Sequence, residues 1–386
     1  MKARNAVSIE DLRRLAGKRL PGFIFDMIEG GVEDEYGVAR NVDAIRKHVL
    51  WPRMLRDISQ PDLSASLFGR HYDLTFGISA TGPAPIYRVK ADDCLAVVAR
   101  KNNIPFILSG TSGTSMETVR QIGGGNVWYQ LYPARDATIT EDLIKRAADT
   151  GIETLVATVD TMVTPKRERH RRNGITTPIK LTPAVIVRMI GEMAKHPGWF
   201  FDYFLDGGMP MLENWQRYAP PGASSQEVSA FFTSQFPSSH TWASLERWRS
   251  LWKGNFVVKG ILHPADAKQC FAIGADGVTV SNHGGKVMDR APAPIEALPL
   301  VRAAVGPDRL VMMDGGIRRG SDIIVARALG ADFVFVGRAT LYGVAAGKAA
   351  GAQRAVDILA EELKLTLQTL GCPRINDVGP EYLSPE

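Results

Sequence analysis

Short runs of apolar residues recur along the chain, and each run ends in glycine or in a polar residue. Two runs, at 310–313 and 333–336, are continuously apolar, which is typical of strands buried on both faces of a parallel sheet. The segments between successive runs have apolar residues at helical spacing. We therefore predict eight strands, at 76–82, 106–110, 127–132, 154–160, 256–260, 277–283, 310–316 and 333–337.

An eightfold alternation of strand and helix is typical of the α/β class and of the (β/α)8 or TIM-barrel fold. We therefore expect one domain over 1–386, with the barrel at 71–370. Residues 1–70 are predicted to form a helical N-terminal extension, which begins with a capping-box-like sequence at Ser8. The helices expected in the barrel lie at 91–103, 114–122, 140–150, 242–253, 264–273, 294–305 and 320–329, with one or two more between 342 and 370.

The fourth and fifth predicted strands are separated by roughly 95 residues, far more than a usual connection. A long insertion after strand 4 is therefore expected, and we assign it to 182–236 on the catalytic face of the barrel. Residues 181–190 have the pattern of an apolar helix start, and 199–205 contain five aromatic residues. These side chains either cover the barrel or a neighbouring subunit, or form an interfacial helix at a membrane surface.

Composition excludes several classes of protein. The chain has 46 Lys and Arg against 41 Asp and Glu, and its one basic run, 166–172, contains an acid and no aromatic residue, so nucleic acid is not expected as a partner. Cys94, Cys270 and Cys372 lie far apart and fit neither a disulfide framework nor a zinc site, so no metal is predicted. No signal peptide and no apolar stretch of about 18 residues is found, so we expect a cytoplasmic protein.

The segments after the last two predicted strands combine glycine with arginine. Glycine lets main-chain N–H groups approach an anion, a helix N-terminus favours negative charge, and arginine supplies a bidentate clamp. Together they predict a phosphate site. Neither a dinucleotide-binding glycine motif nor a Walker loop is found, so NAD or ATP in a doubly wound fold is not expected. The residues assigned to the phosphate end are Asp314, Gly316, Arg318, Gly337 and Arg338.

The other polar strand ends are expected to surround the rest of the same ligand, because barrel enzymes place their chemistry at the carboxyl ends of the strands. Gln130 and its neighbours can bond the edge of a flat heterocycle, and Lys259 offers positive charge to an atom that becomes anionic on reduction. His283 is followed by two glycines, which leave open space before its ring. The residues assigned to this part are Thr81, Gly82, Ser109, Gln130, Thr158, Lys259 and Ser281.

The segment 281–289, Ser-Asn-His-Gly-Gly-Lys-Val-Met-Asp, resembles the active-site motif of the FMN-dependent 2-hydroxy acid oxidase and dehydrogenase family. The two glycine- and arginine-containing segments match that family's phosphate loops. Residues 29–37 and 337–343 are most similar to the mandelate dehydrogenase branch of the family. The resemblance covers almost the whole chain except about 185–235. It implies FMN as cofactor, a small-molecule substrate and a homo-oligomer, in this family a tetramer.

The resemblance also implies a role for each matching residue. His283 is then the base that takes a proton from the substrate, Asp160 stabilises the resulting imidazolium, and Tyr132 bonds the substrate oxygen. Arg167 matches an arginine that holds the substrate carboxylate, and Lys259 a lysine near the flavin. The substrate-binding set is Phe25, Thr111, Arg167 and Lys286.

Two of these positions depart from the family's pattern. Lys286 replaces an arginine and loses its planar fork, and Phe25 replaces a tyrosine hydroxyl, whose bond to a charged group is worth about 1.5–3 kcal/mol. The first hypothesis is FMN-dependent oxidation of an (S)-2-hydroxy acid, mandelate-like or lactate-like, to the 2-oxo acid. The second is oxidation of an alcohol or amine without a simple carboxylate, and the third a flavin-bearing protein without turnover.

The electron acceptor follows less directly from the sequence. Gly82 stands where the mandelate dehydrogenases also have glycine and several oxidases have alanine, which favours an acceptor other than oxygen. If the insertion at 182–236 contacts a membrane, the protein lies at the inner face of that membrane and a quinone can reach the flavin there.

Overall fold

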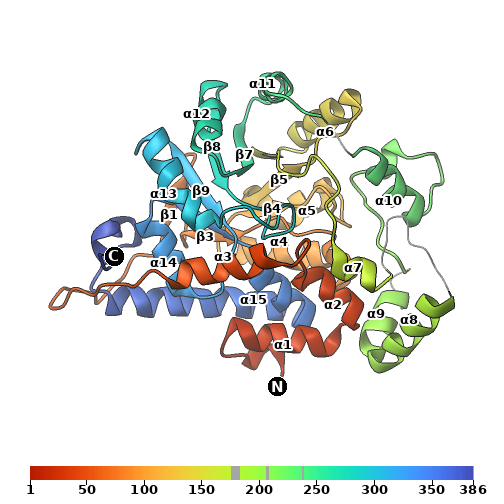
Figure 1. Ribbon diagram of the computed structural model, residues 1–386, viewed down its shortest axis with the longest axis horizontal. Coiled ribbons are helices and arrows are strands. Elements are labelled where there is room, and N and C mark those ends of the chain that lie inside the picture. Colours follow the sequence, from red (N-terminus) through yellow and green to blue (C-terminus); the bar gives the residue numbers. More distant parts are fainter. Residues whose placement is uncertain (175–182, 206–207, 237–238, 386) are drawn as a thin grey trace.

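The computed structural model describes residues 1–174, 183–205, 208–236 and 239–385. Its centre is a closed barrel of eight parallel strands (Figure 1). The barrel closes where Val334 pairs with Phe76. All eight predicted strands are confirmed, as β3 (Phe76–Ile78), β4 (Phe106–Leu108), β5 (Val127–Leu131), β6 (Thr154–Thr158), β7 (Asn255–Ile261), β8 (Gly277–Val280), β9 (Leu310–Asp314) and β10 (Phe333–Val336).

Helices surround the strands on the outside of the barrel (Figure 1). Each predicted helix is present with small shifts at its ends, and the last one is kinked at Gly347 and Lys348, where the backbone is not helical. They are α4 (Ala91–Lys101), α5 (Met116–Gly123), α6 (Ala137–Asp149), α11 (Trp242–Leu251), α12 (Pro264–Ala272), α13 (Pro294–Val305), α14 (Gly320–Ala328) and α15 (Arg338–Thr369).

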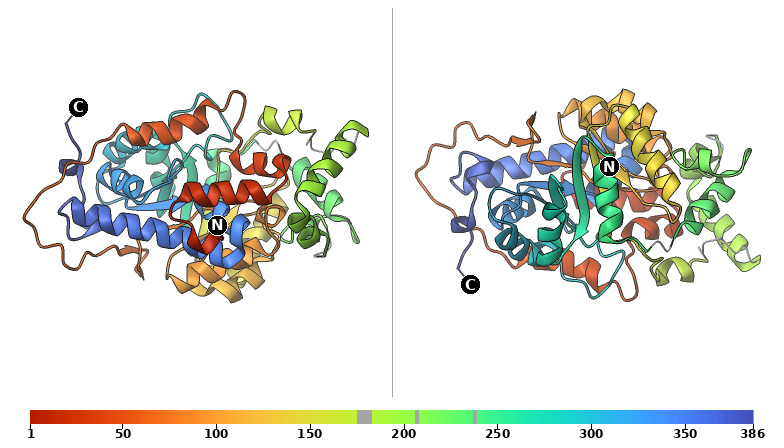
Figure 2. Two further views of the ribbon diagram at one scale, coloured as in Figure 1. Left: turned by 90° about the horizontal axis from the view of Figure 1, so that it is seen from below. Right: turned by 90° about the horizontal axis from the view of Figure 1, so that it is seen from above.

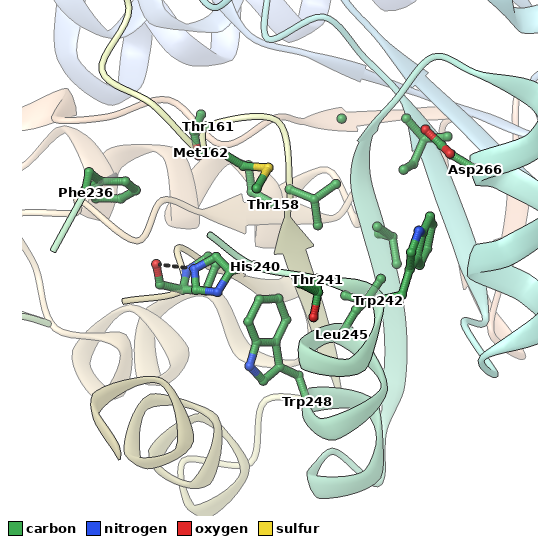
Figure 3. A pocket seen from close by; sticks show the side chains of 15 residues that line it. Thr158, Thr161, Met162, Phe236, His240, Thr241, Trp242, Leu245, Trp248 and Asp266 are labelled. Carbon is green, nitrogen blue, oxygen red and sulfur yellow. Dashed lines mark hydrogen bonds between the residues drawn. The ribbon is translucent and has the colours of Figure 1, made fainter. Parts of the chain in front are cut away.

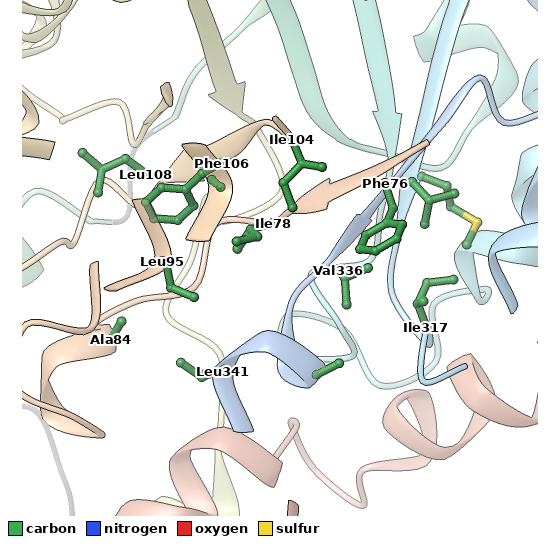
Figure 4. Packing of buried hydrophobic residues seen from close by; sticks show 14 of the residues in the cluster. Phe76, Ile78, Ala84, Leu95, Ile104, Phe106, Leu108, Ile317, Val336 and Leu341 are labelled. Atoms are coloured by element: carbon green, nitrogen blue, oxygen red, sulfur yellow. The ribbon is translucent and has the colours of Figure 1, made fainter. Parts of the chain in front are cut away.

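Large apolar side chains fill the barrel at the amino end of its strands. Trp128 and Phe335 pack inside it with ring centroids 5.4 Å apart, and Phe333 meets Tyr72 of the hairpin β1 (Ala65–Leu67) and β2 (Arg70–Tyr72) at 6.2 Å. A second apolar layer lies between the strands and the helices (Figure 4). Because these layers occupy the lower barrel, its polar residues gather at the carboxyl ends of the strands.

The N-terminal extension is helical only as far as Arg46. It contains α1 (Ile9–Arg19), α2 (Gly22–Glu29) and α3 (Tyr36–Arg46), and α1 runs beside α15 (Figure 2). Ser8 caps α1 as predicted, accepting a hydrogen bond from the Asp11 amide. The predicted helical extension is confirmed, and its helices end at Arg46. Pro52 and Pro61 lack the N–H that a helix needs, and β1 pairs with β2 instead.

The expected insertion follows β6, the fourth barrel strand, and extends to one side of the barrel (Figure 1). Its helices are α7 (Glu168–Arg172), α8 (Pro183–Lys195), α9 (Pro197–Leu205) and α10 (Ser225–Ser234). The first two residues of the predicted apolar helix at 181–190 lie outside the described residues. In the part of the chain that the structure describes, no helix is both long and apolar enough to cross a bilayer.

Candidate active site

His283, Asp160 and Tyr132 meet at the carboxyl ends of three strands. Nδ1 of His283 lies 3.0 Å from Oδ1 of Asp160, and its Nε2 lies 3.3 Å from the hydroxyl of Tyr132. A carboxylate at Nδ1 fixes the proton of a neutral imidazole on that nitrogen. Nε2 is then the proton acceptor, and His283 and Tyr132 both line the same cavity.

Opposing effects set the protonation states of Asp160 and Tyr132. Burial disfavours the charged form of Asp160, but the charge and hydrogen bond of His283, together with Lys259, outweigh it and hold the pKa of Asp160 below its usual value. Burial raises the pKa of Tyr132, so its hydroxyl stays protonated at neutral pH and can donate a hydrogen bond. The site therefore offers a carboxylate, a histidine acceptor and a phenol donor together.

The main chain at His283 has an uncommon conformation. His283 has φ of +56°, and the two residues after it, Gly284 and Gly285, have φ of +65° and +75°. A non-glycine residue in this left-handed region persists only where its surroundings hold it. The Ser281 hydroxyl accepts the His283 amide at 3.1 Å, and the Asn282 carbonyl and side-chain oxygen accept the Gly285 amide.

A cavity at the carboxyl ends of the strands gathers most of the predicted site. It extends from His283 to the glycine segments after β9 and β10. A Cβ built on Gly337 would meet no atom closer than 3.6 Å, so the space in front of this residue is open. The predicted residues that line the cavity are Thr81, Gly82, Tyr132, Lys259, His283, Lys286, Asp314, Gly316, Arg318, Gly337 and Arg338.

Other predicted residues lie around this cavity. Lys259 donates to Ser281 at 2.8 Å and forms an ion pair with Asp314 at 3.2 Å. Gln130 donates to Thr158 at 2.9 Å, and both are buried. Ser109 and Thr111 bond each other at 3.0 Å, close to Gly82. Arg167 is the residue before α7, and burial lowers its pKa.

The side chain of Arg318 suits the predicted phosphate clamp, but that of Arg338 does not. Among the described residues, the side chain of Arg318 donates only to the adjacent carbonyl of Ile317, so most of its guanidinium remains available. Arg338 instead uses four of its five N–H groups on main-chain carbonyls. Its side chain is therefore less available for the predicted clamp than that of Arg318, whereas its amide opens α15 beside the glycine segment.

Phe25 does not lie in the cavity. Its ring packs against Gly17 of α1 and lies 6.5 Å from the ring of Tyr342, so it faces α1 and α15. The resemblance to the family placed it at the substrate, because Phe25 was matched to a tyrosine that binds the substrate carboxylate. The residue of α2 that lines the cavity is Ile28, and the carbonyl of its neighbour Met27 accepts the Lys286 ammonium at 2.8 Å.

Lys286 and His170 lie close enough to Arg167 for its charge to lower the pKa of both. Burial, Arg338 and Arg167 hold the pKa of Lys286 well below its usual value. His170 was not singled out from the sequence; it is buried in α7, and its Nε2 has no partner in the described part of the chain. Burial, Arg167 and Lys286 lower its pKa to about 4, so it is neutral at pH 7. The sequence could have indicated it, because His170 follows Arg167 by one helical turn and therefore lies on the same side of the chain.

A second cavity, of about 300 Å³, lies between β6, β7 and α11 (Figure 3). Its lining combines Trp242, Leu245 and Trp248 of α11 with polar residues such as Thr158 and Asp266. Nε2 of His240 lies 3.3 Å from the carbonyl oxygen of Pro133, and among the described residues no hydrogen bond joins this histidine to a carboxylate. The cavity lacks the histidine–carboxylate pair and the glycine segments, so we do not assign the active site to it.

Two glycine segments with Arg318, a buried lysine and a histidine–aspartate pair meet at one barrel cavity, an arrangement typical of a cofactor-dependent barrel enzyme. The chain belongs to the FMN-dependent dehydrogenase family, whose model matches residues 16–385. It is 39% identical over 385 residues to (S)-mandelate dehydrogenase of Pseudomonas putida, covering 100% of this chain and 95% of that protein. It is 35% identical over 373 residues to an L-lactate dehydrogenase of Stenotrophomonas maltophilia, covering 97% of each.

Solved structures agree with this family. A monotopic membrane protein, (S)-mandelate dehydrogenase, superimposes with a TM-score of 0.93 at 38% identity, covering 99% of this chain and 100% of that one. A mandelate oxidase with (S)-4-hydroxymandelic acid gives 0.82 at 31% identity, covering 98% of each chain. The chain is thus an oxidoreductase of the FMN-dependent 2-hydroxy acid dehydrogenase and oxidase family.

The residues present fit FMN. Buried polar atoms without a protein partner in the described residues occur at both ends of the site, and each would cost about 1–3 kcal/mol if it stayed unsatisfied. A flavin with a phosphate tail offers such partners, and Arg318 with the glycine segments suits the phosphate. The orphaned atoms are Thr81 Oγ1, Gln130 Oε1, Asp160 Oδ2, Arg167 Nε and Asp314 Oδ1.

Proposed function

We propose that this protein oxidises an aryl (S)-2-hydroxy acid, of the mandelate type, to the 2-oxo acid. The observation that carries the proposal is the contact of His283 with Asp160 on one side and with Tyr132 on the other. An aromatic substrate is favoured over a lactate-like one because Phe232 and Phe236 of the insertion each lie 6.2 Å from the Tyr132 ring.

In this proposal His283 takes a proton from the substrate at Nε2, and Asp160 stabilises the imidazolium that forms. Tyr132 donates a hydrogen bond to the substrate oxygen. Arg167 and Lys286 hold the carboxylate, whose negative charge relieves the repulsion between these two cations. FMN, when bound, supplies the two-electron acceptor, and Lys259 holds positive charge beside it.

One observation favours a second candidate, an alcohol or amine substrate without a simple carboxylate. Lys286 already donates to the Met27 carbonyl, and its lowered pKa weakens it as an anion ligand. Anaerobic flavin reduction separates the candidates. We expect (S)-mandelate to bleach the flavin absorbance faster than L-lactate. Bleaching by benzylamine or benzyl alcohol but by neither acid would favour the second candidate, and no bleaching by any of the four would contradict both.

We further propose that the insertion binds a membrane surface from the cytoplasmic side. Apolar side chains are exposed on both of its helices at 183–205, with Val187 exposed by 70% on α8, and Phe204 and Leu205 by 68% and 82% on α9. A structural relative is described as a monotopic membrane protein. Such a surface would bring a quinone acceptor close to the cavity.

Vesicle binding tests this second proposal. The wild-type protein should sediment with vesicles that contain anionic lipid, and the pair Phe204→Glu with Leu205→Glu should abolish sedimentation without changing flavin content. Leu365→Glu is the matched control, because it places the same charge on an exposed leucine outside the insertion; Leu365 lies on α15 and is 56% exposed. Equal sedimentation of all three proteins, or none by the wild type, would contradict the membrane proposal.

A further inference from the structure

Arg338 joins three parts of the molecule through main-chain carbonyls. Its Nε donates to Ile28 at 2.9 Å, and its Nη2 donates to Glu29 at 3.3 Å and to Gly30 at 3.1 Å. Its Nη1 donates to Gly284 at 2.8 Å. The guanidinium at the start of α15 therefore connects the end of α2 with the loop that carries the candidate base.

The end of α2 needs such donors. A helix leaves its last four carbonyls without intrahelical partners, and the negative end of its dipole favours cations. Arg338 satisfies the carbonyls of residues 28–30, and Lys286 satisfies the Met27 carbonyl at 2.8 Å. Both cations come from the carboxyl end of the barrel. The N-terminal extension is thus fixed to the active-site face. Burial and the charge of Arg318 lower the pKa of Arg338 to about 10, so Arg338 stays charged at neutral pH.

The same guanidinium acts on the strained loop. Gly284 directly follows His283, and both have left-handed φ, so the orientation of the Gly284 carbonyl is coupled to the direction of the histidine ring. On the other side of the loop, Asn282 and Asn41 exchange two amide hydrogen bonds at 2.8 and 2.7 Å. Arg338 supplies the restraint on the side facing α2 and the phosphate end.

We propose that Arg338 is a positioning residue for His283: it ties the Gly284 carbonyl to the C-terminal carbonyls of α2 and so keeps the imidazole between Asp160 and Tyr132. Arg318 then carries the side-chain contact to the cofactor phosphate. This inference rests on the proposed function for the role of His283. Its geometric part, the restraint of the loop, does not depend on any substrate.

The test compares Arg338→Met with Arg318→Met, which removes the neighbouring guanidinium. Hydrogen exchange is measured for the peptide 281–289 in the FMN-loaded proteins. Arg338→Met should speed exchange of the Gly285 amide by about 10-fold or more, because opening of the loop becomes easier. Arg318→Met should leave that exchange within about 2-fold of wild type. FMN affinity should change in the opposite order, falling more in Arg318→Met.

Flavin reduction under anaerobic conditions gives the functional readout. At saturating FMN, Arg338→Met should slow reduction by (S)-mandelate by about 10-fold or more through loss of orientation, with KM little changed. If Arg338→Met does not fold, Arg338→Lys is measured in its place. It keeps the charge but cannot span the three carbonyls of α2, so exchange of the loop should still rise.

Unchanged loop exchange in a folded Arg338 variant, with FMN affinity lost as in Arg318→Met, would show that Arg338 is only a phosphate ligand and overturn the inference. Failure of the proposed function is distinguishable, since no substrate would then bleach even the wild-type flavin. The exchange measurement would still decide the role of Arg338 in restraining the loop.

Discussion

Gly260 lies directly against Asp160: a Cβ built on Gly260 would come within 2.6 Å of the Asp160 Cβ and Cγ atoms. Gly260 has φ of +102° and sits where the register between β7 and β8 shifts. β7 lies between β6 and β8, the strands that lead to Asp160 and His283. The irregularity in β7 therefore makes the room in which the carboxylate reaches the histidine.

This relationship predicts the effect of Gly260→Ala. The new methyl group must displace Asp160, so the Asp160–His283 hydrogen bond should lengthen and flavin reduction should slow by about 10²-fold, the scale of a lost general-base arrangement. FMN content should stay normal. Gly254→Ala, on the loop before β7, serves as a stability control, because its Cβ would also meet a main-chain oxygen, at 2.4 Å, away from the site. Equal kinetics for both variants would count against the role of Gly260.

Lys286→Arg should improve the use of simple 2-hydroxy acids. A guanidinium can meet a carboxylate at two points, which the ammonium cannot, so kcat/KM for (S)-mandelate should rise, by up to about 10-fold for each 1.4 kcal/mol regained. Phe25→Tyr is the control: its ring faces Gly17 and Tyr342, so kcat/KM should not change. An improvement in Phe25→Tyr but not in Lys286→Arg would contradict the placement of both residues.

Asp92 predicts a pH dependence of stability. Burial raises its pKa from 3.8 to about 7, despite hydrogen bonds from Ser112 and the Gly113 amide. The folded state thus holds the proton more tightly than the unfolded state. Stability should be highest below pH 3.8 for this group and should fall as the pH rises to about 7, by roughly 4 kcal/mol in total.

The variant Asp92→Asn isolates this effect. Its free energy of unfolding should exceed that of wild type by a larger margin at pH 8 than at pH 5, the difference being roughly 2–3 kcal/mol by urea denaturation. Asp149→Asn, on the exposed surface of α6, should show the same difference from wild type at both pH values. A pH-independent difference for Asp92→Asn would mean that Asp92 is ionised in the fold.

The barrel could be predicted from the sequence because a strand buried on both faces needs a continuous apolar run, as in β9 and β10. The rule that strand ends share one face placed His283 and Asp160 on the same side of the barrel, and the resemblance to the family implied their pairing. The side on which the Phe25 ring packs could not be predicted, since it depends on how α2 is rotated about its axis relative to α1. The partners of Arg338 are main-chain carbonyls, which every residue has and which leave no signal in the sequence.

The most direct test of the account is His283→Gln. We expect the purified variant to bind FMN as the wild type does, because among the described residues the phosphate contacts proposed for Arg318 and the glycine segments do not involve His283. Mixed anaerobically with (S)-mandelate in a stopped-flow instrument, its flavin should be reduced at least about 10²-fold more slowly than the wild-type flavin. Reduction of the FMN-loaded variant at a rate close to wild type would contradict the assignment of His283 as the base.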